Sequence, residues 1–304
     1  MRITAAALAG SMALMADVSG ASASAKKKQK HINQDAPIAS QKQDTEYLSV
    51  EPFDDGVERL PQRFGGVDRV KVAAILSSAS LTLKKGEYET VAEHKKRTEV
   101  QAGAALSPMS INALYAFKPY GATFQYDADA QEFVGKGFTC HITYPDVSLK
   151  EWASCGVGDL NVIKSTYVGS NSFGASSLVY KYRGERLAVG IQLEKNPAMS
   201  VFKKSFRWLD YEDRFGVPVD KAKTVESKDI SVLFVGKVIS TDMFNGHSLV
   251  KEATISNPED VLITEKTIKI DLHEAVYYVY STGEILHKKK FKQHEQQIDL
   301  LRPL

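Results

Sequence analysis

The sequence lacks the motifs that would indicate an enzyme or a cofactor site. It contains no Gly-x-Ser-x-Gly, no His-Glu-x-x-His, no Cys-x-x-Cys and no phosphate-binding loop. Only two cysteines are present, Cys140 and Cys155, so a zinc site would need His141 and a fourth ligand. Adjacent residues of a strand point to opposite faces, so Cys140 and His141 would not converge on one ion. No catalytic residue, metal ligand or cofactor is therefore predicted.

A strong charge of one sign and long apolar runs are also missing. The formal net charge is +2, and 43% of the residues are hydrophobic, as in ordinary soluble globular proteins. A near-neutral balance gives no general attraction to nucleic acid or to a membrane surface, and no nucleic-acid motif is present. Beyond the N-terminus, no apolar run approaches the roughly 20 residues of a membrane-spanning helix.

The N-terminus has the order of a secretory signal peptide. Arg2 supplies a positive charge, residues 3–16 carry none, and Ala23 and Ala25 have the small side chains that a signal peptidase accepts. This order predicts cleavage after Ala25 and a periplasmic or secreted protein. The alternative is an alanine-rich, disordered tail of a cytosolic protein.

Three parts are expected along the chain: a signal peptide over 1–25, a flexible lead-in over 26–63 and a β-rich globular domain over 64–304. The lead-in is too polar at its start to bury enough apolar area to offset the entropy of ordering. After it, apolar spacing predicts a helix over about 67–76. Thr90-Val91-Ala92-Glu93 predicts a capping box at the start of a second helix, with Gly103 near its end.

From about residue 110 onward, alternating apolar residues predict strands. Residues 178–182 and 187–193 alternate on either side of Arg183-Gly184-Glu185, which predicts a hairpin with its turn there. Residues 231–239 are apolar on both faces, which predicts a central strand. Further features are expected in these places: turns at 126–130 and 281–283, a last strand over 284–292, and a helix beginning at Asn196-Pro197. The predicted fold class is α+β, mostly β, with antiparallel sandwich-like sheets and N-terminal helices.

Three short segments resemble a loose group of uncharacterised exported bacterial proteins. They are Gly86-Glu87-Tyr88-Glu89-Thr90 with Glu93 and Arg97, Tyr126-Asp127-Ala128-Asp129, and Tyr280-Ser281-Thr282-Gly283-Glu284. The resemblance implies an exported globular protein. It implies no activity and no functional residue.

Asp127-x-Asp129 has the spacing of two calcium ligands. A complete EF-hand loop from Asp127 would need Gly and Glu where Glu132 and Phe138 stand, so the segment is interpreted as an Asx-type turn. Other polar or aromatic residues are interpreted as structural: the hairpin loop 169–174, the loop residues Asp54 and Asp55, and the core or rim residues Trp152 and Trp208.

Three lysines share one face of the last predicted strand: Lys288, Lys290 and Lys292. They are consistent with an edge strand that is protected by charge against pairing with other sheets. They could also contact an anionic partner, such as lipopolysaccharide or a cell-wall polymer.

The two cysteines are predicted to form a disulfide. An even number of cysteines in an exported protein favours pairing, because the compartment is oxidising. Phe138 to Tyr144 reads as a strand, and Cys155 lies far enough along the chain to return to it. The alternative is a pair of buried free thiols.

These features favour an exported, non-catalytic binding or structural protein of the bacterial envelope. Its expected partner is an anionic envelope polymer or another envelope protein. The competing hypothesis is an exported hydrolase whose catalytic residues come together from distant loops.

Overall fold

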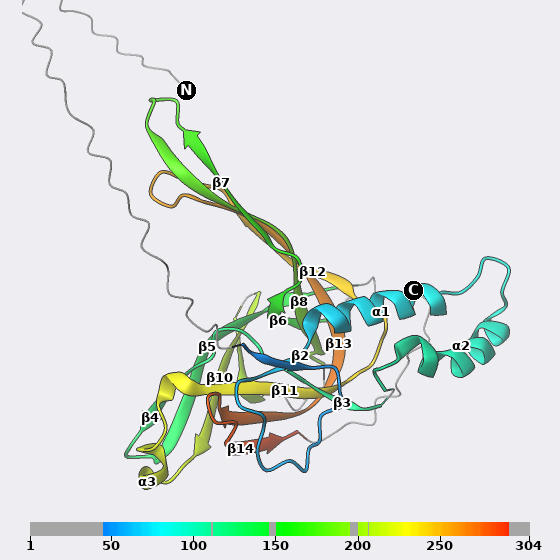
Figure 1. The fold of residues 1–304 in the computed structure, drawn as a ribbon, viewed down its shortest axis with the longest axis horizontal. Coiled ribbons are helices and arrows are strands. Elements are labelled where there is room, and N and C mark those ends of the chain that lie inside the picture. The colour runs from blue at the N-terminus through cyan, green and yellow to red at the C-terminus, as the bar shows by residue number, and fades with distance from the viewer. Residues whose placement is uncertain (1–44, 111, 146–149, 195–199, 206, 292–304) are drawn as a thin grey trace, which may run out of the picture. The chain divides into compact units, whose positions relative to one another are not determined.

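The computed structural model describes residues 45–110, 112–145, 150–194, 200–205 and 207–291. Within these ranges the protein is α+β and mostly β, as predicted (Figure 1). The strands form one mixed sheet of 14 strands rather than the separate sheets of a sandwich. Most neighbouring strands are antiparallel, and two pairs, β1 with β2 and β8 with β13, are parallel.

The strands have the following bounds: β1 Tyr47–Ser49, β2 Phe64–Val67, β3 Leu114–Phe117, β4 Thr123–Asp127, β5 Glu132–Thr143, β6 Trp152–Asp159, β7 Ile163–Ser170, β8 Ser176–Gln192, β9 Phe202–Lys204, β10 Trp208–Gly216, β11 Ile230–Val238, β12 Phe244–Lys251, β13 Glu259–Val279 and β14 Ile285–Lys290. The main path through the sheet is β1-β2-β3-β11-β13-β8-β6-β5-β10-β9. Of the remaining strands, β12 and β14 pair with β13, β4 pairs with β5, and β7 pairs with β8.

The helices are α1 (Arg69–Leu83), α2 (Val91–Leu106) and the short α3 (Val219–Ala222), with a 3₁₀ turn at Ser227–Asp229. The side chain of Asp68 caps α1 by accepting a hydrogen bond from the backbone N–H of Lys71. The predicted capping box of α2 is confirmed: Thr90 and Glu93 each accept from the other's backbone N–H. Gly103 does not end α2, which continues to Leu106. The helix start expected at Asn196-Pro197 lies outside the described residues.

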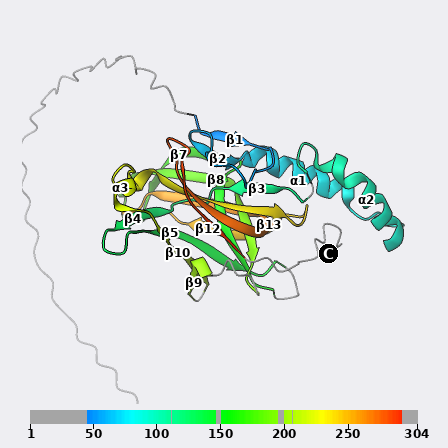
Figure 2. The same ribbon diagram turned by 90° about the horizontal axis from the view of Figure 1, so that it is seen from below.

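The predicted central strand is confirmed as β11, which lies between β3 and β13. Phe234 packs on one of its faces in a large core that includes Leu76 of α1 and Phe117 of β3. Leu233 packs on the other face in a smaller core with Tyr278. Figure 2 shows α1 running along one side of the sheet. Both faces of β11 are therefore covered, which explains its continuous apolar sequence.

The predicted turn at Arg183-Gly184-Glu185 is wrong, because β8 runs straight through it from Ser176 to Gln192. Its hairpin partner is β7, and the connecting loop is 171–175. Gly184 has a φ of +147°, and a Cβ there would approach the backbone of Asn161 and Val162. The glycine thus permits the loop between β6 and β7 to approach β8 closely and does not reverse the chain.

The expected boundary of the globular domain at residue 64 lies too late. β1 pairs with β2, Leu60 is buried in the smaller core, and the N–H of Leu60 donates to the carbonyl of Gly283. Residues 45–63 therefore belong to the fold. The expected signal peptide, 1–25, and residues 26–44 of the expected lead-in lie outside the described residues.

The predicted disulfide is confirmed: Cys140 of β5 and Cys155 of β6 are bonded, and both are completely buried. The adjacent residues His141 and Ser154 are paired across the same two strands. The bond therefore joins neighbouring strands inside the core and does not tether an isolated loop.

Candidate functional site

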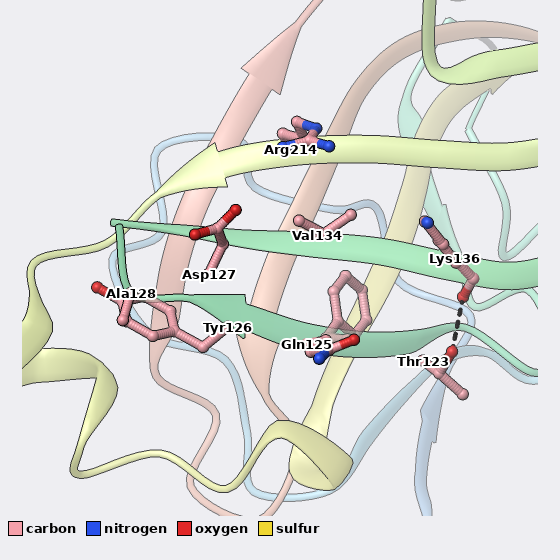
Figure 3. Close-up of a pocket in the computed structure, with 9 residues that line it drawn as sticks. Thr123, Gln125, Tyr126, Asp127, Ala128, Val134, Lys136 and Arg214 are labelled. Carbon is pink, nitrogen blue, oxygen red and sulfur yellow. Dashed lines mark hydrogen bonds between the residues drawn. The ribbon is translucent and has the colours of Figure 1, made fainter. Parts of the chain in front are cut away.

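A hollow of about 710 Å³ lies on β4, β5 and β10 (Figure 3). Gln125, Val134 and Arg214 form one cross-strand row, and Thr123 and Lys136 are paired in the next. Thr123 donates to the backbone carbonyl of Lys136 at 3.1 Å. Lys136 is exposed and Arg214 lies 3.9 Å from the carboxylate of Glu132, so the hollow presents two cations at an open surface.

Asp127 also lines this hollow, but its carboxylate accepts from the backbone N–H groups of Asp129 and Ala130, each at 3.1 Å. These bonds confirm the Asx-type turn expected here. No group of three or more His, Cys, Asp or Glu residues in the described ranges is arranged to hold a metal ion. The hollow can accept a polar ligand, and nothing in its arrangement activates a nucleophile.

A buried polar cluster lies deeper in the fold, where β6 and β13 face the backbone of β12. The hydroxyl of Ser154 donates to Glu265 Oε2 at 3.2 Å and is hydrogen-bonded to Thr267 Oγ1 at 2.8 Å. Burial raises the pKa of Glu265, while the Ser154 hydroxyl, the charge of Arg186 and a backbone hydrogen bond from His247 oppose the rise. A Cβ on Gly246 would meet Thr267 and Ser154, so this glycine lets β12 close over the cluster.

Two histidines stack beside this cluster. The rings of His141 and His247 lie 3.9 Å apart and nearly parallel, and the ring of Trp208 lies 4.3 Å from His141. Burial, together with the smaller effect of the charges of His247 and Arg186, lowers the pKa of His141 to about 4. Burial also lowers the pKa of His247, so both rings are neutral at neutral pH.

Serine, histidine and glutamate thus lie close together, but not in the order that catalysis requires. In a hydrolase the histidine takes the proton of the serine, and the acid orients the histidine. Here Ser154 donates directly to Glu265, and Ser154 is completely buried, so a substrate could not reach its oxygen. The cluster is a satisfied polar part of the interior.

A further network of hydrogen-bonded polar side chains connects β10, β13 and β14. The hydroxyl of Tyr211 donates to that of Tyr277 at 2.8 Å, and Tyr277 donates to Asp213. Lys289 Nζ donates to Asp213 Oδ1 at 2.5 Å. Burial raises the pKa of both tyrosines. Each member has a partner, so this network also reads as structural.

Glu274 differs, because it is only 2% exposed and neither of its carboxylate oxygens has a hydrogen-bond partner in the described part of the chain. Burial raises its pKa, and the charges of Lys288 and Lys290 oppose the rise. A raised carboxyl pKa means that the protonated form is favoured in the folded state. The stability that comes from this raised pKa should be fully present below the ordinary glutamate pKa. It should be lost as the pH rises through the raised pKa of Glu274.

We therefore expect Glu274→Gln to stabilise the protein in a pH-dependent way. The gain over wild type should be small at pH 4 and reach about 1–3 kcal/mol at pH 8, because the variant removes a poorly solvated acid. Urea unfolding across this pH range measures it. Glu265→Gln is the matched control, because Glu265 is also buried but is hydrogen-bonded, so its gain should be smaller. An equal gain for both variants would contradict this account.

The structure places the predicted lysines against the loop that precedes β2. Lys288 Nζ donates to the backbone carbonyls of Asp55 and Val57, and Lys290 lies 3.6 Å from the carboxylate of Asp55. Lys292 lies outside the described residues. Lys288 and Lys290 are thus engaged with the protein's own chain, and β14 pairs only with β13 among the described strands, as the edge-strand interpretation expects.

The other residues interpreted as structural are distributed as follows. Asp54 accepts from the backbone N–H of Gly56, Trp152 is buried, and Trp208 is partly exposed beside His141. The glycine-flanked segment 169–174 leads into the loop that joins β7 to β8.

The strongest surface feature is the hairpin arm, which we define as the β7–β8 hairpin over residues 163–183. Figure 1 shows it extending away from the rest of the sheet, with the β12–β13 hairpin running alongside its lower part. Every residue of β7 except Gly169 is exposed. Phe173, in the loop, is 93% exposed, and Val168 is 73% exposed. Several other apolar side chains of the arm are exposed: Ile163, Tyr167, Leu178 and Tyr180.

Sequence reasoning missed this arm, because it assigned Leu178 and Tyr180 to a different hairpin. A signal was nevertheless present: from Ser165 to Tyr180 the chain carries no charged residue. Exposed apolar residues that cluster in this way mark interaction surfaces more often than isolated ones do.

Comparison with known proteins adds no assignment: the chain matches no protein-family model, no curated protein and no solved structure. The resemblance to exported bacterial proteins therefore stays a prediction. Among the described helices, none has the length and apolarity that crossing a bilayer would require.

Proposed function

We propose that the protein is an exported, non-catalytic binding protein of the bacterial envelope and that it attaches to its partner through the hairpin arm. The observation that carries the proposal is the uncharged, solvent-exposed surface of the arm, on which several large apolar side chains are exposed together, with Phe173 in its loop. A soluble protein gains nothing from exposing such residues together unless a partner covers them.

Two further observations support it. The signal-like start and the buried Cys140–Cys155 bond both suit an oxidising compartment outside the cytoplasm. The serine of the polar cluster is buried and bonded to an acid, which speaks against the alternative of an exported hydrolase at this position. The engaged Lys288 and Lys290 make the arm a better contact than the last strand.

Cell fractionation tests the proposal. Wild type should accumulate in the envelope pellet, and a variant with Val168, Phe173 and Leu178 all changed to serine should shift to the soluble periplasm or the medium. The matched control changes Leu81, Tyr88 and Val100 to serine, because these residues are equally exposed and apolar but lie outside the arm. This control should pellet like wild type.

N-terminal sequencing of the same fractions tests export. The mature chain is expected to begin at Lys26. A cytosolic chain that retains Met1 to Ala25, or an arm variant that still pellets like wild type, would contradict the proposal.

A further inference from the structure

The pairing of β7 with β8 fixes the order of side chains from the tip of the hairpin arm to its base. Val168 is paired with Leu178, Tyr167 with Val179, and Thr166 with Tyr180, in successive steps away from the loop. Two further steps pair Ser165 with Lys181 and Lys164 with Tyr182. Next to the loop, two pairs of small residues, Ser170 with Ser176 and Gly169 with Ser177, separate Phe173 from Val168 and Leu178. From the loop to the base, the arm therefore presents Phe173, a serine-rich segment, the apolar pair Val168–Leu178, tyrosines and then lysines.

The tip combines one large apolar side chain with small neighbours. Phe173 is flanked by Ser172 and Gly174, and an additional Cβ on Gly174 would meet nothing within 4 Å. Asn171 accepts from the backbone N–H groups of Phe173 and Ala175, each at 3.0 Å, which holds the loop in a defined turn. The ring of Phe173 therefore stands at the end of the arm without other bulky groups around it.

The tyrosine level lies where a second hairpin joins the arm. The N–H of Tyr180 donates to the carbonyl of Pro258, in the loop between β12 and β13. Ile255 of that loop is more than half exposed. Tyr167 and Tyr180 are both partly exposed at this level. Tyrosine is the residue that favours the boundary between hydrocarbon and water, because its ring is apolar and its hydroxyl is polar.

The lysine level carries positive charge that the local acids do not neutralise directly. Asp260 binds Arg183 with two hydrogen bonds, at 2.7 and 2.8 Å, and Glu259 is paired with Lys251. Lys164 is exposed, and its ammonium lies over the Tyr182 ring, 5.8 Å from the ring centre.

We infer that the partner of the hairpin arm is the surface of a lipid bilayer carrying anionic headgroups, an inference that rests on the proposed function. The order of an exposed Phe173 at the tip, then tyrosines, then lysines matches the order of hydrocarbon, interface and anionic headgroups met on leaving a membrane, and the small serine side chains around Phe173 do not obstruct its entry. Insertion is confined to the tip, because the open backbone edge of β7 could not be satisfied within hydrocarbon.

Vesicle co-sedimentation of the exported protein tests the inference, with phosphatidylethanolamine vesicles that contain or lack phosphatidylglycerol. Phe173→Ser should lower the partition coefficient roughly tenfold on both vesicles, which is the loss expected when a Phe side chain is no longer buried. Lys164→Gln combined with Lys181→Gln should lower it roughly tenfold on the anionic vesicles at low salt and much less at high salt. Tyr88→Ser is the matched control, because Tyr88 is an equally exposed aromatic residue outside the arm.

Each outcome has a defined meaning once thermal unfolding has verified that the variants are folded. Loss of binding by Phe173→Ser with unchanged binding by Tyr88→Ser supports the inference. Failure of wild type to sediment with either vesicle overturns it. If the arm is then still required for envelope fractionation, the partner is another envelope component and not a lipid surface, and the proposed function stands. If the arm is not required for envelope fractionation either, both the inference and the proposed function are contradicted.

Discussion

Replacing Gly283 by alanine is expected to lower the free energy of unfolding by roughly 2–5 kcal/mol, from a strained backbone combined with steric overlap. Gly283 has a φ of +75° in the turn between β13 and β14. A Cβ at this position would overlap the carbonyl oxygen of Leu60. The backbone cannot move away easily, because the N–H of Leu60 donates to the carbonyl of Gly283 at 2.8 Å.

Gly174→Ala separates the two contributions. Gly174 has a nearly equal φ of +81°, but a Cβ there would meet nothing within 4 Å. Only the backbone strain should remain, at a cost of about 1–2 kcal/mol. Urea unfolding of both variants measures the difference, which should appear in the transition midpoint with an unchanged slope. Equal losses in the two variants would show that the contact with Leu60 does not matter.

Removal of the disulfide is expected to have the second large effect. Cys140 and Cys155 are separated by 15 residues, and the entropy of the loop that they close corresponds to roughly 3 kcal/mol. The double variant Cys140→Ala, Cys155→Ala should lose about this amount and keep its fold, because His141 and Ser154 still pair across the same strands. Alanine is preferred to serine, since both positions are completely buried and a hydroxyl there would lack a designed partner.

The buried position has a second consequence. A thiolate reductant must reach a sulfur atom before exchange can occur, so the native protein should resist reduction until denaturant opens the core. Urea unfolding of the double variant and of wild type, with and without reductant, measures both effects. Two free thiols per chain in the denatured, unreduced protein would contradict the bond itself.

Several features could be read from the sequence because short-range interactions produce them. The capping box of α2 requires only Thr90 and Glu93, three residues apart, and the Asx-type turn requires Asp127 and its next residues. The central strand β11 was visible because its apolar residues are continuous. The disulfide could be assigned because only two cysteines exist.

The same reasoning failed where the structure depends on which distant segments meet. Alternating residues around Arg183-Gly184-Glu185 fit a hairpin equally well, and only the parallel pairing of β8 with β13 shows that the strand continues. The face shared by Lys288 and Lys290 was predicted correctly, but their contacts with Asp55 and Val57 cross more than 200 residues of sequence. Local periodicity carries no information about such partners.

The sequence by itself determined the fold class, the helix start at Thr90, the central strand and the cysteine pair, because each follows from local hydrogen bonding, residue periodicity or the small number of candidates. The tertiary structure decided which apolar residues remain exposed. Val179 and Phe173 lie on the same uncharged stretch, yet Val179 is buried and Phe173 is 93% exposed. The difference arises from strand pairing, which brings cover to one residue and places the other in an open loop.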